Sequence, residues 1–242
     1  MGRVRYEPIT WERLTDALAD RIAGLHGGTA TGTATGSAAD TETGSAAAAA
    51  GTAEASPWRR VALDGAPATR PGELARGLAD ALRVRGRSAL VVAADGFLRP
   101  ASLRFEHGRR DPDAYYDLWY DTGALWREVF APLDPGGDGR VLPDLWDPER
   151  DRATRSEPVR LPAGGVLLLH GPLLLGHWFP FDLSVHLRLS AGALARRTDP
   201  GEQWTLPAFE RYARETAPEE AADVVVRADD PRRPAWNGAP LR

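Results

Sequence analysis

Residues 58–82, WRRVALDGAPATRPGELARGLADAL, combine a short apolar run, a glycine-led turn and a helical repeat. The run extends from Val61 to Asp64, and Leu74, Leu78 and Leu82 recur four positions apart, as they would on one face of a helix. A strand, a glycine-led turn and then a helix form the setting of many phosphate-binding loops. This stretch therefore predicts the first strand, turn and helix of an α/β domain.

Further apolar runs follow this unit at intervals. The predicted strands are Ser88–Ala94, Gly165–His170, Leu183–Leu189 and Asp223–Arg227, and the predicted helices include 191–197 and 207–216. Asp113 and Asp121 are predicted N-caps of two more helices, the second ending at Pro132. Residues 134–164, rich in Pro, Gly and Asp, are interpreted as a long excursion. Strands alternating with helices predict a mainly parallel sheet flanked by helices, whose ligands bind at the carboxyl ends of the strands.

Three segments are expected along the chain. In residues 1–26, Leu14, Leu18, Ile22 and Leu25 recur at helical spacing from about Thr10 and predict an N-terminal amphipathic helix. Residues 27–57 contain almost only Gly, Ala, Thr and Ser and are expected to be a disordered, flexible linker, because they offer no large apolar side chain to a core. Residues 58–242 form the predicted α/β domain.

Composition excludes several classes of function. The chain of 242 residues has a net charge of -4 and a pI of about 5.8, which disfavours nucleic acid as a partner. It has no cysteine, so disulfides and thiolate metal sites are excluded. No signal sequence or membrane-spanning run is expected, so a cytoplasmic location is predicted. All 30 basic residues counted as Lys or Arg are arginine, so any mechanism that requires a lysine ammonium is excluded.

Six motifs occur in order between Trp58 and Pro234. They are the loop at Asp64-Gly65, Asp95-Gly96-Phe97 with Arg99-Pro100, Arg104 to Asp117, Val166 to Gly171, Leu194 to Arg197, and Ala222 to Pro231. In this order they resemble the uridine-kinase-like bacterial branch of the P-loop nucleoside kinases. The resemblance implies a P-loop NTPase-like fold and ATP-dependent phosphoryl transfer to a nucleoside or similar small hydroxyl acceptor, with ATP and Mg²⁺ as cofactors of an active enzyme.

The resemblance also implies roles for individual residues. Asp95 is the candidate base for the acceptor hydroxyl or a group that helps to hold Mg²⁺, and Arg196 and Arg197 are candidates to stabilise the transferred phosphoryl. The residues implied to bind phosphate are Gly65, Thr69, Arg70 and Gly72, and those implied to surround the nucleoside are Phe97, Arg99, Arg104, Arg109 and Tyr115. Each also has a structural interpretation: a strand-end cap for the aspartate, a solvated helix face for the arginines, and core for the aromatic residues.

The loop departs from the family pattern Gly-x-x-x-x-Gly-Lys-Ser/Thr at three positions. Counted from Gly65, the chain has Arg70 for the second glycine, Pro71 for the lysine and Gly72 for the hydroxyl residue. Pro67 and Pro71 also lack the backbone N–H that a phosphate-binding nest requires. An ordinary strand–turn–helix connection, with proline in the first turn of the helix, is the alternative interpretation.

Other chemistry receives less support from the sequence. The run Leu167 to Gly171 superficially resembles an oxyanion loop, but the chain has no Gly-x-Ser-x-Gly nucleophile motif. The five histidines lack metal-ligand spacing, so no metal site is predicted. His107 with Arg104, Arg109 and Arg110 is either an anion-binding cluster or a solvated loop. Two hypotheses remain: a nucleoside kinase with impaired or altered catalysis, or an inactive domain that binds a nucleotide or a protein. The oligomeric state stays open.

Overall fold

The structure is a computed structural model that describes residues 5–25 and 56–238. The predicted linker, residues 27–57, lies outside the described residues up to residue 55. Ser56 already belongs to the folded domain, because its buried hydroxyl donates to the carbonyl of Leu133 at 2.7 Å. None of the helices in the two described ranges is long and apolar enough to cross a membrane.

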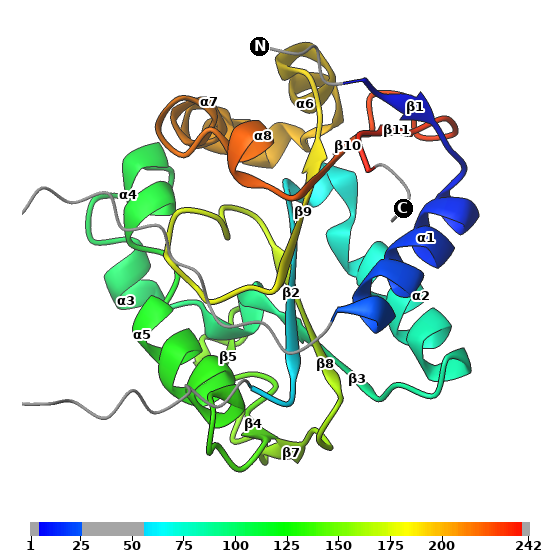
Figure 1. Ribbon diagram of the computed structural model, residues 1–242. Helices are drawn as coiled ribbons and strands as arrows, with labels where there is room; N and C mark the ends of the chain where they lie inside the picture. The colour runs from blue at the N-terminus through cyan, green and yellow to red at the C-terminus, as the bar shows by residue number, and fades with distance from the viewer. Residues whose placement is uncertain (1–4, 26–55, 239–242) are drawn as a thin grey trace, which may run out of the picture.

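A mainly parallel sheet forms the centre of the molecule (Figure 1). In the described residues its order is β1-β11-β10-β9-β2-β8-β3. Strands β3, β8, β2, β9 and β10 run parallel, and β11 and β1 extend one edge in antiparallel pairing. The bounds are β1 Glu7–Pro8, β2 Arg59–Gly65, β3 Ala89–Ala93, β8 Val166–Gly171, β9 Leu183–Arg188, β10 Val224–Arg227 and β11 Ala235–Trp236. The predicted sheet is confirmed.

Strand β2 is the point at which the strand order reverses. The chain leaves β2 for β3 on one side, returns through β8, and then crosses to β9 on the other side. In open α/β sheets such a reversal leaves a crevice at the carboxyl ends of the strands, where ligands bind. The carboxyl end of β2 is Asp64-Gly65, so the fold places the predicted loop at this crevice.

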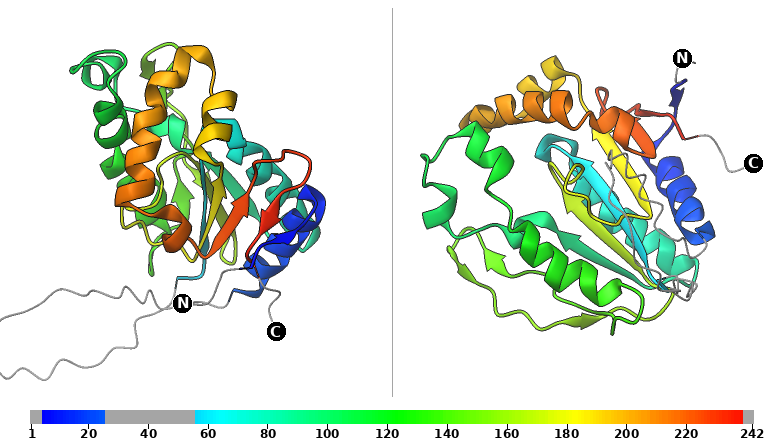
Figure 2. Two further views of the ribbon diagram at one scale, coloured as in Figure 1. Left: turned by 90° about the horizontal axis from the view of Figure 1, so that it is seen from above. Right: turned by 60° about the vertical axis from the view of Figure 1, so that its left-hand side comes forward.

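Helices cover both faces of the sheet (Figures 1 and 2). The helices are α1 Trp11–Gly24, α2 Pro71–Val84, α3 Ala101–Arg104, α4 Pro112–Asp117, α5 Thr122–Leu125, α6 Ala191–Arg197, α7 Leu206–Glu215 and α8 Pro218–Ala221. Helices α1 and α2 lie on one face, and α3, α4 and α5 lie on the other. Near the carboxyl ends of the strands, α6, α7 and α8 close the top of the molecule in Figure 1.

Helix α1 buries one of its faces. Leu14, Leu18 and Ile22 are buried in the core cluster that α1 shares with α2 and the sheet. Thr10 is the N-cap, and its hydroxyl accepts the backbone N–H of Arg13 at 3.3 Å. The spacing of these leucines therefore marks a helix that completes one side of the core.

Removing this cap should measurably destabilise the protein. We expect Thr10→Ala to lower the free energy of unfolding by about 1 kcal/mol, because an N–H of the first helical turn loses its acceptor. Thr10→Ser keeps the hydroxyl and should stay near the wild type. Urea unfolding of the three proteins measures the difference, and equal stability of the alanine and serine variants would contradict a capping role.

The opposite face contains a second core, built around Phe130 and Leu167. Asp121 caps α5 as predicted, through Ala124 N at 2.8 Å, and α5 continues through a π turn over 126–130 and a 3-10 turn over 131–133. The prediction that Asp113 caps the preceding helix is wrong. Asp111 caps α4, because Pro112 occupies the first helical position and leaves Asp113 inside the first turn.

The predicted excursion over 134–164 contains two small antiparallel pairs. Strands β4 Arg140–Val141 and β7 Val159–Arg160 form one pair, and β5 Trp146–Asp147 and β6 Arg152–Ala153 form the other. The excursion is anchored where Val141 and Leu161 enter the second core. It therefore packs as an addition to the domain face that carries α5.

Candidate functional site

The loop after β2 folds as a tight turn. Pro67–Thr69 form one 3-10 turn, and Arg70 adopts a left-handed conformation with φ 55° before α2 begins at Pro71. The hydroxyl of Thr69 donates to the carbonyl of Ala66 at 2.7 Å. A Cβ at Gly65 would lie only 2.5 Å from this hydroxyl, so the turn requires glycine at that position.

The turn uses backbone donors that a phosphate would need. Thr69 N donates to the Ala66 carbonyl at 2.8 Å, and Arg70 N donates to the Pro67 carbonyl at 2.9 Å. Pro67 and Pro71 have no N–H. Phosphate-binding loops work because several successive N–H groups point at one anion. In this conformation Ala68 is the one residue from 67 to 71 whose N–H is left to offer such a donor, so this turn has few donors for a phosphate.

The start of α2 is in contact with His170 from the end of β8. A Cβ at Gly72 would lie 2.9 Å from the imidazole Cε1, so the ring fills the space beside this glycine. Burial lowers the pKa of His170, while the charge of Asp95 raises it by a smaller amount. The position that carries a hydroxyl in the resembled family therefore faces an imidazole here.

A cleft of about 490 Å³ lies between the loop, α1 and the end of β10. Thr69 and Arg70 line it on the loop side, and Arg197 lines it from α6. The guanidinium of Arg197 donates to the carbonyl of Ala228 at 2.8 Å and also to that of Asp229. Arg70 remains exposed and forms only a 3.5 Å ion pair with Glu73. The loop and one predicted lid arginine thus meet, although Arg197 already binds backbone carbonyls.

Asp95 lies beyond the carboxyl end of β3, in a 3-10 turn, and its side chain is exposed. The buried hydroxyl of Tyr120 donates to Asp95 Oδ1 at 3.1 Å and orients the carboxyl group. Burial raises the pKa of Tyr120 well above its ordinary value, so this phenol keeps its proton and remains a donor. The arrangement presents one oriented carboxyl group beyond the end of β3, near His170.

Two solved structures share this architecture. A Bacillus stearothermophilus protein described as a possible uridine kinase superposes with a TM-score of 0.58 and 22% identity, over 72% of this chain and 91% of its own. A Silicibacter sp. TM1040 protein, named as a candidate fructose transport system kinase, superposes with a TM-score of 0.55 and 23% identity, over 88% of this chain and 96% of its own. The chain has the fold of the P-loop kinases. No protein-family model and no curated protein matches its sequence.

Within this fold, three of the residues expected around the nucleoside are buried by packing. Phe97 is fully buried in the second core. Arg104 is buried, donates to the carbonyl of Arg99 at 2.7 Å and lies over Trp119 at 5.2 Å. Tyr115 is buried edge-on against Trp119, with ring centroids 4.9 Å apart. These three side chains are engaged in packing and are not free to contact a ligand in this conformation.

The remaining predicted residues are solvent-facing. Arg109 is exposed and lies over the ring of Phe105 at 5.3 Å. Arg196 is exposed on α6, and its guanidinium has no carboxylate partner within the described residues. Arg70, Asp95 and Arg196 are therefore predicted side chains that are exposed to a ligand. Arg109 is exposed as well but already lies over the ring of Phe105.

A buried network at the end of β2 was not predictable from any motif or spacing in the sequence. Asp64 is fully buried, and its Oδ1 accepts the N–H of Leu174 at 2.9 Å. Its Oδ2 lies 2.6 Å from Nδ1 of His186 and accepts the hydroxyl of Tyr212 at 3.1 Å. That hydroxyl also accepts the N–H of Leu175 at 3.0 Å. The network joins β2, β9, α7 and the β8–β9 connection directly beneath the loop.

Proposed function

We propose that this chain is a catalytically silent protein of the P-loop kinase fold, which binds a hydroxyl-bearing small molecule of nucleoside type and does not transfer phosphoryl groups from ATP. The observation that carries the proposal is the closed turn at 67–71, with two prolines and two N–H groups already bonded within the loop. Phosphoryl transfer depends on positioning and on charge stabilisation by such donors. Without them, the fold retains a cleft but lacks its phosphate-binding element.

The residues present do not fit ATP with Mg²⁺ in the manner of the resembled kinases. Pro71 stands where the resembled loop has lysine, and Gly72 offers no hydroxyl to a metal ion. Within residues 5–25 and 56–238, no group of three or more His, Asp or Glu side chains is placed to hold a metal. A preorganised donor of this kind contributes about 2.7 to 4 kcal/mol to catalysis, and several are missing together.

The surroundings of Asp95 support the ligand part of the proposal. Its carboxyl group is exposed, and Tyr120 orients it through one of its two oxygens. The other oxygen can accept a hydrogen bond from a sugar hydroxyl. A nucleoside provides such hydroxyls on a flat, partly apolar body, which suits the neighbourhood of the aromatic pair Tyr115 and Trp119. The charge of Asp95 contributes to raising the pKa of Tyr115, so the carboxyl group lies near this pair.

Calorimetric titration tests both the absence of ATP binding and the binding of a nucleoside. We expect no heat of binding from ATP with Mg²⁺ at millimolar concentration, and weak, saturable binding of at least one member of a panel that begins with uridine. Asp95→Ala should remove nucleoside binding. Asp80→Ala, which changes an exposed aspartate on α2, should leave it unchanged. Binding of ATP, or a panel without any bound nucleoside, would contradict the proposal.

A second candidate is a weak nucleoside kinase with Asp95 as the base and Arg196 and Arg197 as lid groups. The oriented, exposed carboxyl group of Asp95 favours it. Formation of a nucleoside phosphate in the wild type, abolished by Asp95→Asn, would support this candidate over the first.

A further inference from the structure

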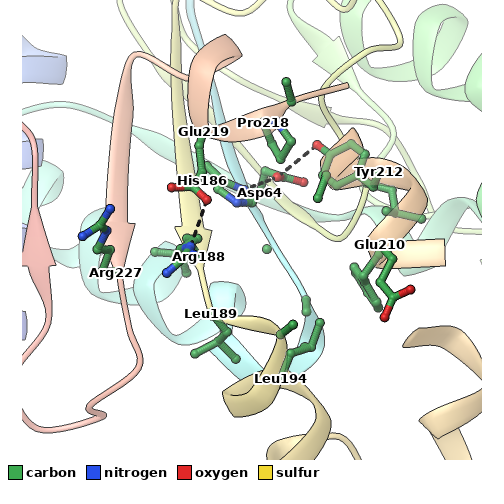
Figure 3. Close-up of a pocket in the computed structure, with 18 of the residues that line it drawn as sticks. Asp64, His186, Arg188, Leu189, Leu194, Glu210, Tyr212, Pro218, Glu219 and Arg227 are labelled. Carbon is green, nitrogen blue, oxygen red and sulfur yellow. Dashed lines mark hydrogen bonds and ion pairs between the residues drawn. The ribbon is translucent and has the colours of Figure 1, made fainter. Parts of the chain in front are cut away.

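A cavity of about 710 Å³ lies on the sheet face opposite to α2, beneath α6, α7 and α8 (Figure 3). The carboxyl ends of β2, β9 and β10 form its floor. Leu173, Leu194 and Phe209 contribute apolar side chains to its walls. Small-molecule sites typically combine such apolar walls with a few polar groups that converge on the ligand.

The polar groups of the floor follow from strand register. Side chains alternate between faces along a strand, and Val185 and Leu187 of β9 belong to the core with α1 and α2. His186 and Arg188 therefore face the cavity. Asp64 is the register neighbour of His186, and Arg227 is that of Arg188. The pairing of three parallel strands thus places these four side chains on one surface.

His186 is oriented by Asp64 and keeps one ring nitrogen open. Its Nδ1 lies 2.6 Å from Asp64 Oδ2, within a network in which Tyr212 also donates to Asp64. His186 lines the cavity, and its side chain is 11% exposed. Its Nε2 has no hydrogen-bond partner among the described residues. With the proton on Nδ1, Nε2 presents a lone pair to a donor.

The charges around the cavity favour a cation. Arg188 is neutralised by Glu219 at 2.9 Å and Asp229 at 3.6 Å. Arg227 lies over the ring of Tyr6 at 3.7 Å, away from Glu210 in Figure 3. Glu210 and Glu220, both exposed, also line the cavity, and in the described residues neither forms an ion pair. The free carboxylates therefore outnumber the free guanidinium.

We propose that this cavity is a second ligand site, which takes a small organic amine with an apolar body. The ammonium group donates to Nε2 of His186 and is attracted by Glu210, and the apolar body packs against Leu194 and Phe209. This amine site does not use the loop to bind phosphate. A failure of the proposed function would therefore leave the amine site untouched, and the reverse is also true.

Three probes of matched skeleton test the proposal by ligand-observed NMR: 2-phenylethylamine, 2-phenylethanol and 3-phenylpropionate. We expect the amine to bind saturably at millimolar concentration or below, at least about fivefold more tightly than the carboxylate. Leu194→Trp, which fills the cavity, should weaken amine binding at least tenfold. Glu210→Gln should weaken it about two- to fivefold, as expected for one exposed charge pair. Glu157→Gln, an exposed change in the excursion, is the matched control and should have no effect.

Three outcomes would overturn the proposal. They are the absence of saturable amine binding, binding of 3-phenylpropionate as tight as that of the amine, and an amine affinity that neither Leu194→Trp nor Glu210→Gln changes. Amine binding should also persist in the presence of ATP and in variants of Pro71, because the cavity lies on the other side of the β2 end. Competition by ATP would place the amine in the loop cleft instead and would equally contradict this site.

Discussion

Asp64→Ala is expected to cause the largest loss of stability among the substitutions considered, about 3 to 5 kcal/mol. The substitution removes the acceptor of three groups at once: the N–H of Leu174, the hydroxyl of Tyr212 and Nδ1 of His186. Each would remain buried without its partner, and an unsatisfied buried polar group costs about 1 to 3 kcal/mol. For a domain of this size, the melting temperature should fall by about 10 °C, as measured by calorimetry.

Two further variants distinguish the stability that the hydrogen bonds of Asp64 contribute from the effect of removing a carboxylate in general. Asp64→Asn preserves the shape and one acceptor oxygen, so it should cost less than Asp64→Ala. Asp80→Ala removes an exposed carboxylate that pairs with Arg83 at 2.8 Å and should change stability by less than about 1 kcal/mol. Equal stabilities for Asp64→Ala and Asp80→Ala would refute the structural role of the network.

Restoring the loop is expected to produce the largest gain in nucleotide affinity. The triple variant Arg70→Gly, Pro71→Lys, Gly72→Ser introduces a lysine, a hydroxyl group and an additional backbone N–H. Each hydrogen bond to a charged group contributes about 1.5 to 3 kcal/mol, so two new bonds to phosphate should increase ATP affinity about 100-fold or more. Calorimetric titration with ATP and Mg²⁺ measures the change.

The contact between Gly72 and His170 determines how this experiment should be designed. A Cβ at position 72 meets the imidazole at 2.9 Å, so the new serine must displace the ring. We expect the triple variant combined with His170→Ala to bind ATP more tightly than the triple variant alone. His170→Ala by itself is the control and should not bind ATP. If the combined variant also fails to bind ATP, the loop is not the element that prevents binding.

The sequence was sufficient to predict the elements whose residues repeat regularly. The four-residue spacing of Leu14, Leu18 and Ile22 predicted α1, because a helix buries one face at that period. The cap of α4 was misassigned because Asp111 and Asp113 are both good caps, and the constraint that decides between them is Pro112. Spacing and capping rules describe interactions between residues that are close in the sequence. They do not predict contacts between residues that are far apart in it.

The candidate site was predictable in part for the same reason. The sequence at Arg70, Pro71 and Gly72 shows directly that the loop lacks the glycine, lysine and hydroxyl residue of the family pattern. The tight turn of the loop could not be predicted from the sequence, because it depends on the left-handed conformation of Arg70. The partners of Asp64 come from positions more than a hundred residues away. Their meeting depends on strand register and on the β8–β9 connection, neither of which leaves a periodic signal.

The two-residue strand β1 has a consequence for how the native molecule opens. Within residues 5–25 and 56–238 it pairs only with β11, which is itself two residues long, so this edge of the described sheet is held by few hydrogen bonds. Strand β2, by contrast, lies between β8 and β9 and is paired along its whole length. Local opening should therefore begin at this edge, and amide hydrogen exchange should be fast at Glu7 and slowest in β2. The strand that ends in the loop and carries Asp64 thus belongs to the last part of the protein to open.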